Sequence, residues 1–338
     1  PGQAEVLRRI ARDGRDGFYA GEVAEDMVGS LRALGGTHTL DDFAATACSY
    51  VEPIVGDYRG HELVELPPNG QGATAILMAK ILARFDLARL EPFGAARAHL
   101  EAEAAKLAYD ARNRFVADPD AGPLRLEHML SDATADALAA LIGPGRVLAD
   151  PVAATEAVHR ETVYLCVVDR DRMAVSLIYS IYHGFGAGLA SARFGINFQN
   201  RGAGFTLRAG HPNEAAGGKR PMHTIIPAML RRDGRVVMPF GVMGGAYQPA
   251  GHVRFLTNLV DFGLDPQAAI DAPRSFAEGG EIQLETGYAD GVAAELAVLG
   301  HRVTRLDAPL GGAQAIAIGD DVLTGASDPR KDGCAIGY

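Results

Sequence analysis

The sequence predicts an α+β protein in which stacked β-sheets are covered by helices. Residues 1–120 and 123–145 carry mainly helical patterns, with apolar residues three and four positions apart. After residue 162 the pattern changes to short runs of alternating apolar and polar residues joined by turn sequences, with a few helical patterns between them. Helical patterns followed by hairpins indicate helices packed on sheets.

The helical patterns of the first half cover residues 4–12, 21–34, 73–85, 95–115 and 123–145. Another helix is expected to begin at Leu40, because Thr39 can cap it and Asp42 follows three residues later. One strand is expected over residues 58–66, where Pro67-Pro68-Asn69-Gly70 ends it. Residues 146–161 show no clear period and are expected to form an exposed connector.

Three hairpins are expected in the second half, each with a turn sequence between two strands. They pair residues 164–168 with 174–181, 225–231 with 235–240, and 313–319 with 321–326. Helices are expected over 253–262, 266–271 and 292–299, with a short strand over 282–285. This order indicates more than one sheet.

Composition excludes several classes of protein. The net charge of −10, with no cluster of Lys or Arg, argues against a nucleic-acid partner. No apolar run is long enough for a membrane span, so no membrane partner is expected. The three cysteines, Cys48, Cys166 and Cys334, are far apart and odd in number, which implies no disulfide framework, and Cys166 is expected to be a small buried residue. The ten histidines show no HxxxH spacing, so neither a metal nor another cofactor is expected.

Thr162 is the most informative residue, because it opens an alternating apolar strand directly after the connector. If the Glu161–Thr162 bond is cut, the hydroxyl of Thr162 becomes a nucleophile and its own α-amine the nearest base. The alternative is an ordinary strand threonine, since strands favour β-branched residues. Thr162 alone does not decide between the two; the surrounding motifs do.

From about Gly14 to Tyr338 the chain resembles the gamma-glutamyltransferase family of N-terminal-nucleophile hydrolases. The motifs that carry the resemblance keep the family's order: Asp16-Gly17-Phe18-Tyr19-Ala20-Gly21, Glu65-Leu66-Pro67-Pro68-Asn69-Gly70-Gln71-Gly72, Val167-Val168-Asp169, Gly218-Lys219-Arg220-Pro221, Gly244-Gly245, Asp271-Ala272-Pro273-Arg274 and Gly325-Ala326-Ser327-Asp328-Pro329-Arg330. Each motif is weak by itself, and their shared order makes the resemblance specific.

The resemblance implies a four-layer αββα sandwich of the N-terminal-nucleophile hydrolase type. Residues 1–161 would be the C-terminal part of a large subunit, and residues 162–338 a small subunit that begins at the nucleophile. The two processed fragments would associate, and a homo-oligomer is expected. The chain begins at Pro1 and lacks the first part of the family's large subunit. A cytoplasmic location is expected, but a signal peptide would lie in the absent part, so the periplasm stays an alternative.

The family's catalytic residues are carried over to matching positions. Thr162 would be the nucleophile, and Gly244 and Gly245 would form the oxyanion hole, although an isolated Gly-Gly pair more often forms a tight turn. Ser180 matches a second threonine that hydrogen-bonds the nucleophile in the family, and a surface serine is its alternative.

The expected substrate-binding residues depart from the transpeptidase pattern. His223 and Thr224 stand where transpeptidases carry two serines that bind the substrate carboxylate, although His223 could be a structural turn residue. Ala203 and Gly204 replace an acidic pair that binds the substrate's α-ammonium, and Tyr182 replaces an asparagine. A buried ammonium without a carboxylate is costly, so selection of γ-glutamyl compounds is not expected.

Asn200 and Arg201 complete the expected substrate site. Arg201 could grip an anionic substrate with two parallel bonds, or it could be a solvated loop arginine. The runs Asn197–Phe205 and Lys219–Pro227 look more like the family's amidase branches, the oxamate amidohydrolases and cephalosporin-acylase-like proteins. The function expected is therefore hydrolysis of an amide bond in a small carboxylate-bearing molecule, with acyl transfer as a minor activity. A true gamma-glutamyltransferase or glutathione hydrolase is the first alternative, and an uncleaved, inactive homologue with a binding role is the second.

Overall fold

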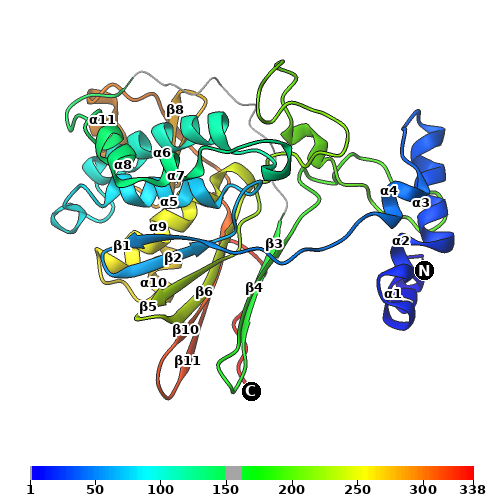
Figure 1. Ribbon diagram of the computed structural model, residues 1–338. Coiled ribbons are helices and arrows are strands. Elements are labelled where there is room, and N and C mark those ends of the chain that lie inside the picture. The colour runs from blue at the N-terminus through cyan, green and yellow to red at the C-terminus, as the bar shows by residue number, and fades with distance from the viewer. Residues whose placement is uncertain (1, 149–161) are drawn as a thin grey trace. The chain divides into compact units, whose positions relative to one another are not determined.

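The computed structural model describes residues 2–148 and 162–338 and divides into two compact units (Figure 1). One unit comprises Pro1–Val51 and Ile181–Arg201, and the other comprises Glu52–Ser180 and Gly202–Tyr338. Each unit therefore combines segments that are far apart in the sequence.

The smaller unit consists of four helices and the loop 181–201. Its helices are α1 (Gly2–Asp13), α2 (Asp16–Tyr19), α3 (Gly21–Ala33) and α4 (Leu40–Ala44). Its apolar core joins helices to loop through Val6, Val23, Met27, Phe194, Ile196 and Phe198. The cap predicted for α4 is confirmed: the Asp42 N–H donates to the Thr39 hydroxyl at 3.2 Å, and the Thr39 N–H donates to the Asp42 carboxylate at 2.7 Å.

The larger unit is built on a six-stranded antiparallel sheet with the order β1-β2-β5-β6-β10-β11. These strands are β1 (Ile54–Tyr58), β2 (His61–Glu65), β5 (Ala228–Arg232), β6 (Arg235–Met243), β10 (Gly312–Ile318) and β11 (Leu323–Ser327). The strand predicted over residues 58–66 is confirmed as β2, but its predicted start is wrong, because a turn at Arg59-Gly60 separates β2 from the strand β1 before it. Arg59 has a φ of +50°, in the left-handed region. Arginine is not among the residues that favour such turns, so the sequence did not indicate one here.

Helices cover one face of this sheet and a separate hairpin covers the other (Figure 1). The hairpin is β3 (Val163–Val168) with β4 (Ala174–Tyr179), and the helices against the sheet are α5 (Gly72–Leu82) and α9 (Gln248–Val260). Neighbouring residues of β6 show the two faces: a Cβ on Gly241 would meet the ring of Tyr164 in β3, while Val242 touches Gly251 of α9. The described residues thus form a helix layer and two β layers.

The remaining elements pack on α5, α6 and α9 and on one another. They are α6 (Ala95–Phe115), α7 (Leu126–Leu130), α8 (Asp132–Ala139), α10 (Pro266–Asp271), α11 (Asp290–Val298), and a small sheet of β7 (Ser275–Glu278), β8 (Glu281–Leu284) and β9 (Val303–Arg305), with 3₁₀ turns at Leu87–Arg89, Pro119–Ala121, Arg201–Gly204 and Gly245–Tyr247. The helix predicted over 95–115 is confirmed, whereas residues 123–145 form two short helices. None of the helices in the described ranges combines the length and apolar character that a membrane crossing requires.

Candidate active site

Thr162 immediately precedes β3 and is half-buried. In the β3–β4 hairpin Val163 pairs with Tyr179, and the pairing continues regularly to Val168 and Ala174. One step further along this register, Thr162 falls opposite Ser180. Ser180, the predicted orienting residue, therefore occupies the cross-strand position opposite Thr162. Glu161, the other residue of the predicted cleavage site, lies outside the described residues.

Tyr164, two residues after Thr162, fixes the hairpin to β6. Its ring lies against Gly241, where an added Cβ would come within 2.4 Å of it. Its hydroxyl is hydrogen-bonded to Ser176 Oγ at 2.8 Å, and Ser176 in turn donates to the Phe240 carbonyl at 3.3 Å. Burial raises the pKa of the Tyr164 hydroxyl well above its usual value, so it stays neutral and acts by packing and hydrogen bonding. Only a glycine in β6 allows the strand of Thr162 to approach this closely.

Gly244 and Gly245 follow β6 directly and turn the chain into α9. Their φ values are +127° and +58°, both in the region that favours glycine, and the Tyr247 N–H donates to the Gly244 carbonyl at 3.1 Å. A Cβ on Gly244 would come within 3.1 Å of the Gly311 Cα. The turn thus needs glycine for its backbone conformation and for its close packing against Gly311 and Tyr247.

Gln71 joins this glycine turn to the segment that carries His223 and Thr224. Its amide nitrogen donates to the carbonyl oxygens of Thr224, at 2.7 Å, and of Gly245, at 2.9 Å. Arg112 donates to its Oε1 at 2.9 Å, which fixes the orientation of the amide. Two sequence-predicted site residues, Thr224 and Gly245, are thus held together by Gln71, which belongs to the Glu65–Gly72 motif and was not predicted as a site residue.

His223 is held through its backbone by Asn69, in the turn at residues 67–70 that precedes Gln71. The His223 N–H donates to the Asn69 carbonyl at 2.9 Å, and the Asn69 amide donates to the Pro221 carbonyl at 2.6 Å. Burial differs between the two neighbours, since Thr224 is buried and His223 is half-buried. The segment is therefore positioned mainly through its backbone. The imidazole of His223, whose Nδ1 accepts from the Ile225 N–H at 3.3 Å, is more accessible than the Thr224 side chain.

A buried histidine–carboxylate pair supports β6 just before the glycine turn. His252 Nε2 accepts from the Val242 N–H at 3.2 Å, so the ring carries its proton on Nδ1, which donates to Glu65 Oε1 at 2.7 Å. Burial raises the pKa of Glu65, and the contact with His252 opposes that shift. Sequence reasoning missed this pair, because its members are 187 residues apart.

The remaining predicted residues, Tyr182, Asn200 and Arg201, lie together in the smaller unit. Asn200 Oδ1 accepts from the His183 N–H at 3.0 Å, and the Arg201 guanidinium lies 4.5 Å from the centre of the Tyr182 ring. Arg201 is buried, so its reading as a solvated loop arginine is wrong. Burial lowers its pKa to about 10, which leaves the guanidinium charged at neutral pH. The structure therefore groups these three predicted residues around one buried cation.

This arrangement has parallels among known proteins. The family model described as Gamma-glutamyltranspeptidase matches residues 1–338. The crystal structure of a cephalosporin acylase from Bacillus halodurans superposes with a TM-score of 0.90 at 36% identity, covering 100% of this chain and 63% of that one. The fold, with its mixed helices and strands, is thus of the N-terminal-nucleophile hydrolase type. The chain belongs to the gamma-glutamyltranspeptidase family.

Two curated relatives match along almost the whole chain. The glutathione hydrolase-like YwrD proenzyme of Bacillus subtilis is 35% identical over 344 residues, covering 99% of this chain. The oxamate amidohydrolase proenzyme of Klebsiella pneumoniae is 34% identical over 357 residues, covering 100% of this chain. The chain spans 65% of the length of each relative. The predicted resemblance to the family, including its amidohydrolase and acylase members, is confirmed.

Proposed function

We propose that this chain carries the catalytic part of an autoprocessing amidohydrolase with Thr162 as its N-terminal nucleophile. The observation that carries the proposal is the anchoring of the β3–β4 hairpin on β6. Tyr164 packs on Gly241, three residues before Gly244, and the hairpin register points Thr162 toward Ser180. The names of the relatives, two of them proenzymes and all of them acting as hydrolases or acylases, support the same reading.

Processing requires only the groups of the cleaved bond and one water. The Thr162 hydroxyl attacks the carbonyl carbon of Glu161, the C–N bond breaks, and the hydroxyl proton passes to the released nitrogen. Water then hydrolyses the resulting ester, which yields a carboxylate on Glu161 and a free α-amine on Thr162. The products would be the subunits 1–161 and 162–338, which stay associated; the four-layer αββα arrangement stays part of this proposal.

Hydrolysis of the substrate repeats the same chemistry. The α-amine of Thr162 accepts the proton of its hydroxyl as the oxygen attacks the substrate amide carbon, and the amine passes that proton to the leaving nitrogen. The backbone N–H groups at Gly244 and Gly245 would stabilise the oxyanion, and Ser180 would orient the nucleophile. Water resolves the acyl-enzyme in a second cycle.

The substrate we propose is a small amide that carries a carboxylate. Arg201 supplies a buried positive charge stacked on Tyr182, and arginine is suited to hold carboxylates. His223 and Thr224 would add hydrogen-bond donors, and Asn200 would orient the loop through His183. Neutral residues at Ala203 and Gly204 disfavour a substrate with an α-ammonium group. Oxamate and acylated side-chain amides are the classes to test first.

The experiment uses the full-length precursor and its variants Thr162→Ala and Thr162→Ser. Intact-mass spectrometry should show two fragments, the second beginning at Thr162, in the native protein, a slower cut in Thr162→Ser, and one uncut chain in Thr162→Ala. Thr324→Ala, an exposed strand threonine, serves as the control that cuts normally. A native chain that stays intact after long incubation would overturn the proposal and favour an inactive, binding homologue.

A substrate panel then separates the amidohydrolase from its rival. We expect ammonia release from oxamate or cleavage of an acyl amide, and little turnover of a γ-glutamyl anilide. Rapid turnover of that anilide, stimulated by glycylglycine, would instead identify a gamma-glutamyltransferase.

A further inference from the structure

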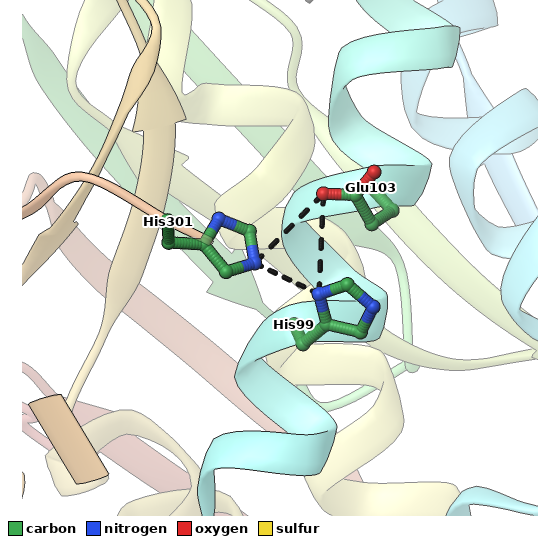
Figure 2. Close-up of side chains that lie close together, drawn as sticks. All are labelled: His99, Glu103 and His301. Atoms are coloured by element: carbon green, nitrogen blue, oxygen red, sulfur yellow. Dashed lines mark hydrogen bonds and ion pairs between the residues drawn. The ribbon is translucent and has the colours of Figure 1, made fainter. Parts of the chain in front are cut away.

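Helix α6 carries a buried cluster of nitrogen and oxygen donors that the proposed reaction does not use. His99 and Glu103 lie one turn apart on α6, and His301 comes from the chain just before β9 (Figure 2). All three side chains are at most 5% exposed. Buried ionisable groups that converge from two elements need either mutual pairing or a ligand.

The three donor atoms converge closely enough for one metal ion to reach them all after small movements of the side chains. His99 Nδ1 and His301 Nε2 are 2.8 Å apart, and Glu103 Oε1 lies 4.0 and 3.8 Å from them. In a tetrahedral zinc site neighbouring donor atoms are about 3.3 Å apart. A point about 2.1 Å from every donor, the length of a zinc–nitrogen bond, lies in the plane of the three donor atoms. Tetrahedral coordination would require the two imidazole nitrogens to move apart by roughly 0.5 Å and Glu103 Oε1 to move closer by a similar amount.

The outer contacts orient two of these donors. His99 Nε2 lies 2.9 Å from the Gly143 carbonyl, to which it donates, so the lone pair of the ring is on Nδ1 and faces the cluster. Glu103 accepts the Leu148 N–H on Oε2 at 2.8 Å, which turns its Oε1 toward the two imidazoles. Metal-binding histidines and carboxylates in proteins are held by outer bonds of this kind.

We propose that His99, Glu103 and His301 form a binding site for one divalent transition-metal ion, zinc in particular, with water as the fourth ligand. Two neutral imidazoles and one carboxylate are a donor set that zinc accepts. The ion would connect α6 to the segment before β9 and so serve the stability of the larger unit. The metal site uses none of the residues proposed for catalysis at Thr162, so this inference does not depend on the proposed function.

Lys106 is the group that competes with the ion. Its Nζ lies 2.6 Å from Glu103 Oε1 and donates to the Leu148 carbonyl at 3.0 Å, so without metal it neutralises the carboxylate. An ammonium beside a divalent cation is repelled, and it must move when the ion binds. Lys106 and His301 both line a cavity of about 120 Å³, which gives the flexible lysine stem and the fourth ligand room.

This competition supplies a test with effects of opposite sign. The full-length, tag-free protein is stripped with a chelator and titrated with zinc chloride by calorimetry, and its metal content is measured after dialysis. We expect one zinc per chain, an affinity at least about tenfold weaker in His301→Asn, and an affinity several-fold tighter in Lys106→Met. His38→Asn, an exposed histidine in the smaller unit, is the matched control and should not alter the titration.

Cobalt provides a second readout, because four-coordinate Co²⁺ absorbs visible light far more strongly than the hydrated ion. The proposal fails if neither the native protein nor Lys106→Met binds zinc, or if His301→Asn binds it as tightly as the native chain and His38→Asn. Those results would leave a purely structural hydrogen-bonded network. Because Lys106→Met keeps every ligand, a folding defect in His301→Asn does not prevent a decision.

Discussion

Arg112 sets the orientation of Gln71 by donating to its Oε1 at 2.9 Å. The amide nitrogen of Gln71 must therefore face the carbonyl groups of Thr224 and Gly245. Gln71 is fully buried, so these bonds are formed without competition from water. The relative position of the Gly244-Gly245 turn and the segment with Thr224 thus depends on the side chain of Gln71, which lies just before α5.

Replacement of Gln71 tests whether that position matters for catalysis. Gln71→Leu removes both donated bonds, and Gln71→Glu keeps a partner for Arg112 but no donor for the carbonyls. We expect each variant to lose about 1–3 kcal/mol of unfolding free energy, because buried carbonyls are left unsatisfied. We also expect kcat to fall at least about tenfold with little change in KM, since transition-state donors would be displaced.

The control for Gln71 is Gln267→Leu, a glutamine that makes comparable bonds on the surface. It should leave kcat and the cleavage of the precursor unchanged. If Gln71→Leu lowers stability but leaves kcat at the native value, Gln71 is only a structural residue. Urea unfolding and steady-state kinetics on the same preparations separate these outcomes.

Gly244→Ala tests the proposed oxyanion turn. Alanine is strained at a φ of +127°, and its Cβ would approach the Gly311 Cα to 3.1 Å, so the turn must shift. Displacement of one oxyanion donor lowers kcat by about 10²–10³-fold. Gly234→Ala is the matched control, because Gly234 also has a positive φ (+76°) but has open space around it. Equal loss of activity in both variants would argue against a catalytic role for Gly244.

Features fixed by neighbouring residues were predicted well from the sequence. The Thr39 cap, the β3–β4 hairpin and the glycine turn after β6 depend on contacts within a few positions, which residue types indicate directly. The turn at Arg59 and the short strands β7 and β9 were missed. Arg59 is not a usual turn residue, and strands of three or four residues carry too little alternation to stand out.

Residues that act across long sequence separations were not found. Gln71 reaches Thr224 over 153 positions, and His99 reaches His301 over 202. Only the fold brings such pairs together, and a search for HxxxH spacing overlooks a histidine and a glutamate on one helix completed by a distant histidine. The roles of Thr162 and Gly244 stay predictions that the variants above are designed to test, and the roles of Ser180 and Gly245 stay predictions as well.

Cys166 is predicted to be an unreactive thiol. Burial raises its pKa to about 11, although a hydrogen bond with Tyr164 opposes part of the shift. In a Cys48→Ser, Cys334→Ser variant, which removes the two exposed thiols, alkylation at pH 8 should be on the order of a hundredfold slower than for an exposed cysteine. The rate should keep rising as the pH approaches 11, since only the thiolate reacts. A rate that levels off near the ordinary thiol pKa of about 8.5 would show that Cys166 is accessible to water.

Asp328 is predicted to stabilise the fold through a buried ionic network. Its carboxylate accepts from Arg274 at 2.6 Å and from the Ala313 N–H at 2.8 Å, and it also pairs with Arg330 at 3.2 Å. Burial alone would raise the pKa of Asp328, but Arg274 and the bonds from Arg330 and Ala313 outweigh it and hold the pKa below its usual value. Asp328→Asn leaves Arg274 without its buried partner and should cost about 3–5 kcal/mol of unfolding free energy.

The pH dependence of the free energy of unfolding tests whether the charge of Asp328 is responsible. A folded-state pKa below the unfolded value of about 3.9 means that the stabilisation from Asp328 is complete above that pH and is lost as the pH falls through the folded pKa. The free energy of urea unfolding should therefore fall more steeply below pH 4 for the native chain than for Asp328→Asn, which has no carboxylate at this position to protonate. Asp233→Asn, at an exposed hairpin turn, should follow the native curve. Parallel curves for the native chain and Asp328→Asn would show that Asp328 stabilises the fold by hydrogen bonding rather than by its charge.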